Sequence, residues 1–510
     1  MRAPGSGFWL YGDWACFFQG AHPLNCQKSS NGLRLVPMFS SKFIKNQTCA
    51  LVLSAAAAAA CASQLPPELA AAAKKAGITE TSLGLWVSKA GADKPVLSVN
   101  SRRPMNPASV MKVVTTYAAL DLLGPAHRET TTLYSAAGID EKGVLREAFL
   151  KGTGDAHFVA EDVWLFAERL AGLGVKRIAG NIAADRTAFD AASRVEDQGS
   201  FDGAASRPYN VGPDPLAANF KTVSLTFTPQ TQGRVRVSAL PRLSGITVPE
   251  TIRGVKGFCG DVKAKVGVTL EGGTIRFSGP YPVSCGVKTV HYALFDENVY
   301  LTGILRDALA RAGITWSGRI VDGEVPASAK AVASAESAPL SQTVTWINKF
   351  SNNAMARQLF MTLSFADADG MTRPATLARS RAVVTQWLQT KGINPKSVTI
   401  DNGSGLSRTA RISAETLGRV LNRAWVSPVM PEMMASLPAA GVDGTMKKRG
   451  LKTGSAHIKT GYLKDSRSVA GWVTTPAGDR YTVVMMVNSK RPDGAKAFSD
   501  AVLAWCAGRR

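Results

Sequence analysis

The sequence contains few histidines, few cysteines beyond residue 62, and no long apolar run. Only five of its 510 residues are histidine, and none lies near a Gly-x-Ser-x-Gly turn, which argues against a Ser-His-Asp hydrolase. No run after residue 62 reaches about 18 apolar residues, so we expect no transmembrane helix. No spacing of cysteine and histidine suits zinc, and we expect neither a metal nor a cofactor.

The rest of the composition is that of an ordinary globular protein, except for its charge. Hydrophobic residues make up 45% and charged residues 19%, which excludes a disordered or collagenous chain. The length allows roughly three domains of about 150 residues each. Sixty Lys and Arg against 38 Asp and Glu give a net charge of +22. Such a field favours a polyanionic partner: nucleic acid, anionic lipid or an acidic wall polymer.

The N-terminus indicates the compartment. Residues 48–62 are apolar and Ala-rich, follow Lys42 and Lys45, and end in the small-residue sequence Ala60-Cys61-Ala62. This pattern is typical of a cleaved signal peptide, so we expect a leader over 1–62, with Met38 as an alternative start, and a periplasmic location. A buried Ala-rich helix is the alternative. Lipidation at Cys61 is disfavoured because no large aliphatic residue opens a lipobox. Export makes the acidic envelope, not nucleic acid, the expected polyanion.

Three cysteines remain after such processing. Cys259 and Cys285 lie 26 residues apart in one strand-rich stretch, and Cys506 is left over. An oxidising periplasm would permit a disulfide between the first two, with two buried thiols as the alternative.

Helical and strand-like patterns divide the chain into three parts. A β-rich stretch separates two parts in which helices dominate, and this predicts one helix-and-sheet domain split by an insertion. We expect the first catalytic part over 63–120, the insertion over 121–295 and the second catalytic part over 296–510. The expected helices are 66–76, 106–124, 160–173, 298–313, 341–363, 375–392 and 413–425, and the expected strands are 83–89, 95–100, 223–229, 234–240, 266–270, 274–279, 467–475 and 480–488.

The chain contains one Ser-x-x-Lys sequence, formed by Ser109 and Lys112. It falls in the first turn of the helix expected over 106–124, where residues three apart share a face and unpaired N–H groups create a positive potential. Lys112 can therefore reach the Ser109 hydroxyl and act as its base if burial lowers its pKa. Alone, the tetrapeptide is also consistent with an ordinary solvated helix start.

Two further motifs follow in order. Ser351-Asn352-Asn353 offers a hydroxyl and an amide within a helical stretch, and Lys459-Thr460-Gly461 leads into the final hairpin. A glycine there permits close approach of another segment to a strand edge. Lys-Thr-Gly also occurs at 452–454, but that copy lies in a turn-like stretch, so we assign the motif to Lys459.

The three ordered motifs resemble those of the penicillin-recognising serine acyl transferases. The long first gap, together with the stretches at 312–318, 401–408, 437–446 and 457–473, is similar to the D-alanyl-D-alanine carboxypeptidase/endopeptidase family, the class C low-molecular-mass penicillin-binding proteins. The resemblance implies an α+β fold: a penicillin-binding/β-lactamase-like transpeptidase domain, with an antiparallel sheet flanked by helices, that carries two nested β-rich inserted domains.

The resemblance also implies roles for the motif residues. Ser109 would be the nucleophile and Lys112 its base. Ser351 would relay a proton to the leaving amine, and Lys459 would support this transfer electrostatically. Asn353 would orient the substrate amide. Three residues would bind the substrate. Thr460 would contact its carboxylate, Gly461 would let it approach the strand closely, and the Tyr462 backbone N–H would be a donor to the oxyanion.

Tyr462 departs from the family pattern, which usually has Ser or Thr after the Gly of Lys-Thr-Gly. The lost hydroxyl puts efficient carboxypeptidase activity in more doubt than acylation.

The implied function is a serine D-Ala-D-Ala carboxypeptidase and endopeptidase that acts on peptidoglycan and is acylated by β-lactams. A β-lactamase-like hydrolase and a catalytically weak peptidoglycan-binding protein are the alternatives. Nucleic acid is not expected as a partner, peripheral membrane contact stays open, and the sequence specifies no oligomeric state.

Overall fold

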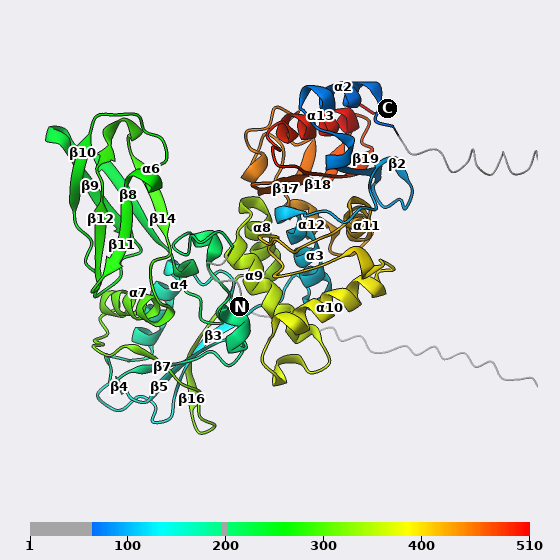
Figure 1. Cartoon of the computed structure of the whole chain (residues 1–510). Helices are drawn as coiled ribbons and strands as arrows, with labels where there is room; N and C mark the ends of the chain where they lie inside the picture. Colours follow the sequence, from blue (N-terminus) through cyan, green and yellow to red (C-terminus); the bar gives the residue numbers. More distant parts are fainter. Residues whose placement is uncertain (1–63, 196–200, 510) are drawn as a thin grey trace, which may run out of the picture. The chain divides into compact units, whose positions relative to one another are not determined.

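The computed structural model describes residues 64–195 and 201–509 (Figure 1). The leader expected over 1–62, with its alternative start and Cys61, lies outside the described residues. No helix within the described ranges is both long enough and apolar enough to span a bilayer.

A five-stranded sheet forms the centre of the catalytic part. Every neighbouring pair in it is antiparallel, and the two strands of the predicted final hairpin lie second and third. The strand that carries Lys459 lies at one edge, as the sequence predicts. In order across the sheet, the strands are β17 (Ala456–Leu463), β18 (Ser466–Thr474), β19 (Arg480–Asn488), β1 (Leu83–Lys89) and β2 (Pro95–Val99).

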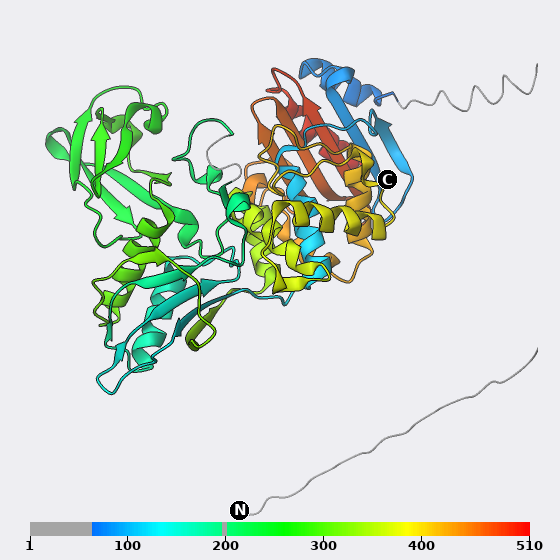
Figure 2. The ribbon, with the colours of Figure 1, turned by 60° about the horizontal axis from the view of Figure 1, so that its bottom comes forward.

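Helices cover both faces of this sheet. Figure 1 and Figure 2 show the first and last described helices together on one face, where their apolar side chains share a core with the strands. The remaining helices form the second core on the other face. Because both faces are covered, β18 and β19 are buried almost throughout. The helices are α2 (Pro67–Lys75) and α13 (Ala495–Ala507) on the first face, and α3 (Lys112–Leu123), α8 (Leu340–Phe350), α9 (Asn353–Thr362), α10 (Leu377–Thr390), α11 (Ala414–Trp425) and α12 (Met430–Ser436) on the second.

The single helix expected over 341–363 is in fact two. Helix α8 ends at Phe350, Ser351 adopts a left-handed backbone conformation with φ of 57°, and α9 begins at Asn353. The Asn352 side chain caps the new helix by accepting a hydrogen bond from the Met355 N–H at 3.1 Å. The apolar periodicity continues through this break, which is why the sequence pattern does not show it.

Two sheet-containing bodies lie between the halves of the catalytic part, one nested in the other along the chain. The outer body has the sheet order β15-β7-β5-β3-β16, a small pair β4-β6, and the helices α4 and α7. Its elements are β3 (Thr130–Ser135), β4 (Val144–Leu145), β5 (Ala148–Gly152), α4 (Ala160–Gly172), β6 (Arg177–Ile178), β7 (Ile182–Asp185), α5 (Ala191–Val195), α7 (Glu297–Arg311), β15 (Ile320–Asp322) and β16 (Lys330–Glu336).

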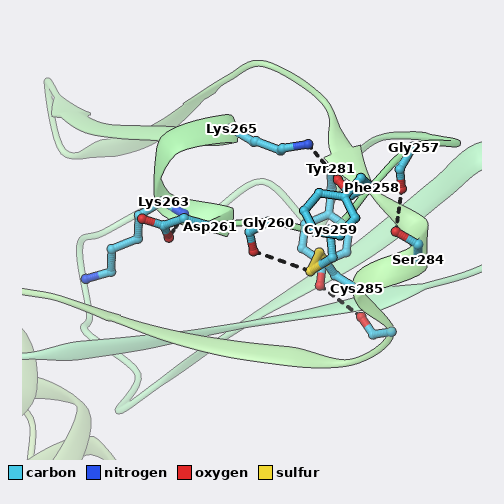
Figure 3. Close-up of a disulfide and its surroundings, with 11 residues drawn as sticks. Gly257, Phe258, Cys259, Gly260, Asp261, Lys263, Lys265, Tyr281, Ser284 and Cys285 are labelled. Carbon is cyan, nitrogen blue, oxygen red and sulfur yellow. Dashed lines mark hydrogen bonds between the residues drawn. A yellow bond between two sulfur atoms is a disulfide. The ribbon is translucent and has the colours of Figure 1, made fainter. Parts of the chain in front are cut away.

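The nested body has the sheet order β13-β10-β9-β8-β14 and the pair β11-β12. A disulfide joins Cys259 to Cys285 within it, with an S–S distance of 2.15 Å (Figure 3), whereas Cys506 is a buried free thiol in α13. Its elements are β8 (Val223–Pro229), β9 (Arg234–Leu240), β10 (Thr251–Val255), α6 (Val262–Lys265), β11 (Gly267–Glu271), β12 (Thr274–Ser278), β13 (Tyr281–Pro282) and β14 (Lys288–Tyr292).

The expected boundaries of the insertion at 121 and 295 do not coincide with this packing. Helix α3 of the catalytic part continues to Leu123. At the other end, α7 shares the core of the insertion, while β15 and β16 pair with β7 and β3. The catalytic part therefore resumes only with α8. The helical periodicity at 298–313 led us to expect that the catalytic part resumes at 296. Periodicity shows which face of a helix is buried, but it does not show which sheet that face packs against.

Candidate functional site

Ser109 lies in a tight turn and not in a regular helix. The segment Ala108–Met111 is a 3-10 turn, and α3 begins only at Lys112, so the helix expected over 106–124 starts later than predicted. The Asn106 side chain forms an Asx turn just before this segment, since its Oδ1 accepts a hydrogen bond from the Ala108 N–H at 2.9 Å. Ala108 has a φ of 49°. The turn places the Ser109 hydroxyl at the amino end of α3.

Lys112 is completely buried and donates three hydrogen bonds. Its Nζ lies 3.1 Å from Ser109 Oγ, 2.6 Å from Asn353 Oδ1 and 2.5 Å from the Ser404 carbonyl oxygen. These bonds use all the N–H groups of an ammonium and include no carboxylate. Burial, and then the charges of Lys459 and Arg357, hold the pKa of the Lys112 amine well below its usual value.

Lys459 is the second completely buried amine of the site. Its Nζ donates to Ser351 Oγ and to the Thr460 carbonyl oxygen, both at 2.8 Å. Burial lowers the pKa of Lys459 to about 7. The left-handed Ser351 at the end of α8 turns its hydroxyl toward this amine, so the break between α8 and α9 places Ser351 and Asn353 beside the two different lysines.

Strand β17 approaches the Ser109 turn closely at Gly461. A side chain there would place its Cβ 2.1 Å from Ser468 Oγ and 2.7 Å from the Pro107 carbonyl oxygen, so only glycine fits. Ser468 of β18 fixes the same contact by donating to the Pro107 carbonyl oxygen at 2.5 Å. Residues more than 350 positions apart in the sequence therefore form one site.

Thr460 and Tyr462 lie on the outer side of β17. The Thr460 hydroxyl donates to Thr445 Oγ1 at 2.8 Å. The Tyr462 side chain is 71% exposed, and the Arg467 guanidinium carbon lies 3.5 Å from its ring centroid, a cation–π contact. The other Lys-Thr-Gly copy, residues 452–454, lies in a turn before β17 and outside any strand.

Three residues that contact this site had no role in the sequence interpretation: Ser404, Ser468 and Thr445. Ser404 lies in the Gly-rich stretch 401–408, where a Cβ on Gly405 would be 2.0 Å from the Ala108 carbonyl oxygen. The two glycines flanking Ser404 were the available signal for a close approach. Ser468 and Thr445 carry no such signal, because a lone hydroxyl in a strand or turn is common.

The chain is similar to known proteins over most of its length. A family model described as "D-Ala-D-Ala carboxypeptidase 3 (S13) family" matches residues 65–508. The D-alanyl-D-alanine carboxypeptidase of Actinomadura sp. (strain R39) is 29% identical over 413 residues, which cover 78% of this chain and 76% of that protein. The D-alanyl-D-alanine carboxypeptidase DacB of Haemophilus influenzae is 23% identical over 429 residues, covering 80% and 85%.

A solved structure has the same fold. The crystal structure of penicillin binding protein 4 (dacB) from Haemophilus influenzae matches with a TM-score of 0.71 at 21% identity, and the match covers 86% of this chain and 99% of that one. This likeness confirms the predicted fold class, a penicillin-binding domain with inserted domains.

Proposed function

Because the chain belongs to the D-Ala-D-Ala carboxypeptidase 3 (S13) family, whose members are serine peptidases, we propose that Ser109 is the nucleophile with which it cleaves D-Ala-D-Ala stem peptides. The observation that carries this assignment is the buried Lys112 amine, which contacts Ser109 Oγ and has no carboxylate partner among the residues that the structure describes. Burial favours the neutral form of this amine, and the neutral amine can accept the Ser109 proton.

Acylation begins when Ser109 Oγ attacks the carbonyl carbon between the two D-Ala residues. Lys112 Nζ takes the hydroxyl proton, and the tetrahedral intermediate carries its negative charge on the former carbonyl oxygen. We assign the oxyanion hole to the backbone N–H groups of Ser109 and Tyr462. The close approach of β17 to the Ser109 turn at Gly461 supports this assignment, and each such donor contributes about 2.7–4 kcal/mol in related acyl transfers.

Ser351 gives its hydroxyl proton to the leaving D-Ala amine and regains the proton that Lys112 took from Ser109, so Lys112 is neutral again; Lys459, bound to the Ser351 hydroxyl, supports this transfer. Asn353, already fixed by its contact with Lys112, orients the substrate amide through its side chain. Thr460 binds the terminal carboxylate. Water then hydrolyses the ester on Ser109, with Lys112 again as the base, and frees the enzyme.

The proposed substrate is peptidoglycan in the periplasm, reached after removal of the leader. Peptide cross-links are the second proposed substrate class, because β17 is an edge strand of its sheet and an extended peptide can bind along such an edge. A β-lactam mimics the D-Ala-D-Ala amide and leaves Ser109 acylated.

The test is labelling with a fluorescent penicillin. Wild type is expected to be labelled and Ser109→Ala to be unlabelled. Lys459→Ala is expected to acylate far more slowly, whereas Lys452→Ala, the matched change in the other Lys-Thr-Gly copy, is expected to label like wild type. Labelling of Ser109→Ala at the wild-type rate would refute the assigned nucleophile.

Mass spectrometry of digested muropeptides identifies the reaction. Loss of one D-Ala from monomers reports carboxypeptidase activity, and conversion of dimers to monomers reports endopeptidase activity. Binding to sacculi without penicillin labelling or muropeptide cleavage would instead indicate a catalytically weak wall-binding protein.

A further inference from the structure

Two threonine hydroxyls form an exposed pair beside Lys459. Thr460 Oγ1 of β17 donates to Thr445 Oγ1 at 2.8 Å, and Thr445 lies in the short 3-10 turn Gly444–Met446. Thr445 is exposed and Thr460 half-buried, so both hydroxyls are accessible. In the free protein each satisfies the other, but a hydroxyl rotates freely and can donate to a new acceptor.

Tyr462, the residue after Lys-Thr-Gly, does not place a hydroxyl beside these two threonines. Tyr462 lies on the same side of β17 as Thr460, two positions along the strand. Tyr462 is 71% exposed, and the Arg467 guanidinium stacks on one face of its ring. The hydroxyl lies at the far end of this ring. It is therefore displaced from the place that a Ser or Thr hydroxyl at this position would occupy.

The turn that carries Thr445 is held firmly against the end of α8. Asp443 Oδ2 lies 2.7 Å from Lys349 Nζ, which also donates to the Leu437 carbonyl oxygen at 2.7 Å. Gly444 has a φ of +51°, and a Cβ on it would lie 2.5 Å from the Lys349 carbonyl oxygen. Since Lys349 precedes Ser351 by two residues, one anchor fixes both Thr445 and the end of α8 that carries Ser351.

We propose that Thr445 is a substrate-binding residue that, together with Thr460, binds the terminal carboxylate of the substrate. On binding, the hydrogen bond between the two hydroxyls opens, and each hydroxyl donates to one carboxylate oxygen. Thr445 thereby supplies the second hydroxyl that Tyr462 does not. This inference rests on the proposed function of the same site.

The experiment compares a ligand that carries the carboxylate with one that lacks its charge. Second-order acylation rates of Ser109 are measured with benzylpenicillin and with its methyl ester, for wild type and Thr445→Val. A hydrogen bond to a charged group corresponds to roughly a 10- to 100-fold effect. We expect a rate loss of that size with the acid and less than about twofold with the ester, and Thr445→Ser is expected to restore the acid rate.

Two further variants separate a binding role from a structural one. Thr453→Val removes an exposed threonine from the other Lys-Thr-Gly copy and is expected to leave both rates unchanged. Tyr462→Thr returns a hydroxyl to β17 and is expected to recover part of the loss when combined with Thr445→Val. Equal losses with acid and ester, or no loss with either, would overturn the inference. Absence of acylation in wild type would instead contradict the proposed function.

Discussion

The catalytic part and the insertion both bury long basic side chains, but they treat the charge in opposite ways. In the insertion, Arg186 is buried and donates to both carboxylate oxygens of the buried Asp214, at 3.1 and 2.9 Å, and to Asp322 at 2.9 Å. In the catalytic part, Lys112 and Lys459 are completely buried, and their partners are hydroxyl, amide and carbonyl oxygens.

The difference separates a structural charge from a reactive one. A buried guanidinium between carboxylates keeps its charge and fixes the geometry of its neighbours. A buried amine without a carboxylate is destabilised in its charged form, which lowers the pKa of Lys112 and of Lys459. The two buried amines thus lower the stability of the folded protein, and their neutral forms become available for proton transfer.

The largest effect is expected when the reactive charge is removed. Lys112→Met keeps the length and burial of the side chain but removes the base for Ser109. General-base catalysis contributes about 10²- to 10⁴-fold, so we expect the rate of penicillin acylation to fall by that factor. Stopped-flow measurement with a chromogenic β-lactam gives this rate, and far-UV circular dichroism checks that the variant is folded.

The control is a lysine with a carboxylate partner. Lys151 of the insertion lies 3.0 Å from Asp185 Oδ2, and Lys151→Met is expected to acylate at the wild-type rate. A Lys112→Met variant that acylates as fast as wild type would show that the base lies elsewhere and would remove the contrast between the two regions.

The second largest effect is expected when the buried Arg186–Asp214 pair is broken, and it should change the free energy of unfolding but not the acylation rate. Asp214→Asn leaves the Arg186 guanidinium buried beside a neutral amide, and breaking a buried pair costs about 3–5 kcal/mol. Asp322, the other partner of Arg186, has a side chain that is 82% exposed, so Asp322→Asn is the matched control, with a loss below about 1 kcal/mol. Urea unfolding followed by tryptophan fluorescence measures both, and equal losses would contradict the assignment.

The sequence predicts those features that depend on short spacings. Ser109 and Lys112 are three residues apart, and one turn brings them together whether it is 3-10 or α-helical. Strands β1, β18 and β19 follow from apolar runs bounded by turn residues. Gly461 could be singled out because a glycine in an edge strand is meaningful only where another segment approaches closely.

Features that depend on long-range packing could not be predicted in the same way. The left-handed Ser351 interrupts an apolar pattern that is continuous in the sequence, because the break is stabilised by partners such as Lys459 more than 100 residues away. The pairing of β16 with β3 spans about 200 residues, and no local pattern specifies it. Thr445 has no local signature, and its relation to Thr460 arises only from the folded loop.

The smallest expected effect concerns Lys459. It measures directly how much stability the protein loses by burying an amine without a carboxylate. In the unfolded chain its pKa is about 10.4, whereas burial lowers it to about 7 in the folded protein. Between these values the unfolded state binds one more proton, so this residue makes the protein more stable as the pH rises from 7 toward 10. Lys459→Met removes that dependence.

At pH 7.5 we expect Lys459→Met to be more stable than wild type by on the order of 2 kcal/mol, after the loss of two hydrogen bonds is counted. The gain should be largest at and below about pH 7 and shrink as the pH rises toward the unfolded-state pKa of about 10.4, above which the amine of wild type is neutral in both states. Urea unfolding at pH 6.5, 7.5 and 9.5 tests this, with the exposed Lys452→Met as a control that should show no pH-dependent gain. A difference that does not change with pH would mean that Lys459 stays charged in the folded protein, and the contrast with Arg186 would then rest on Lys112 alone.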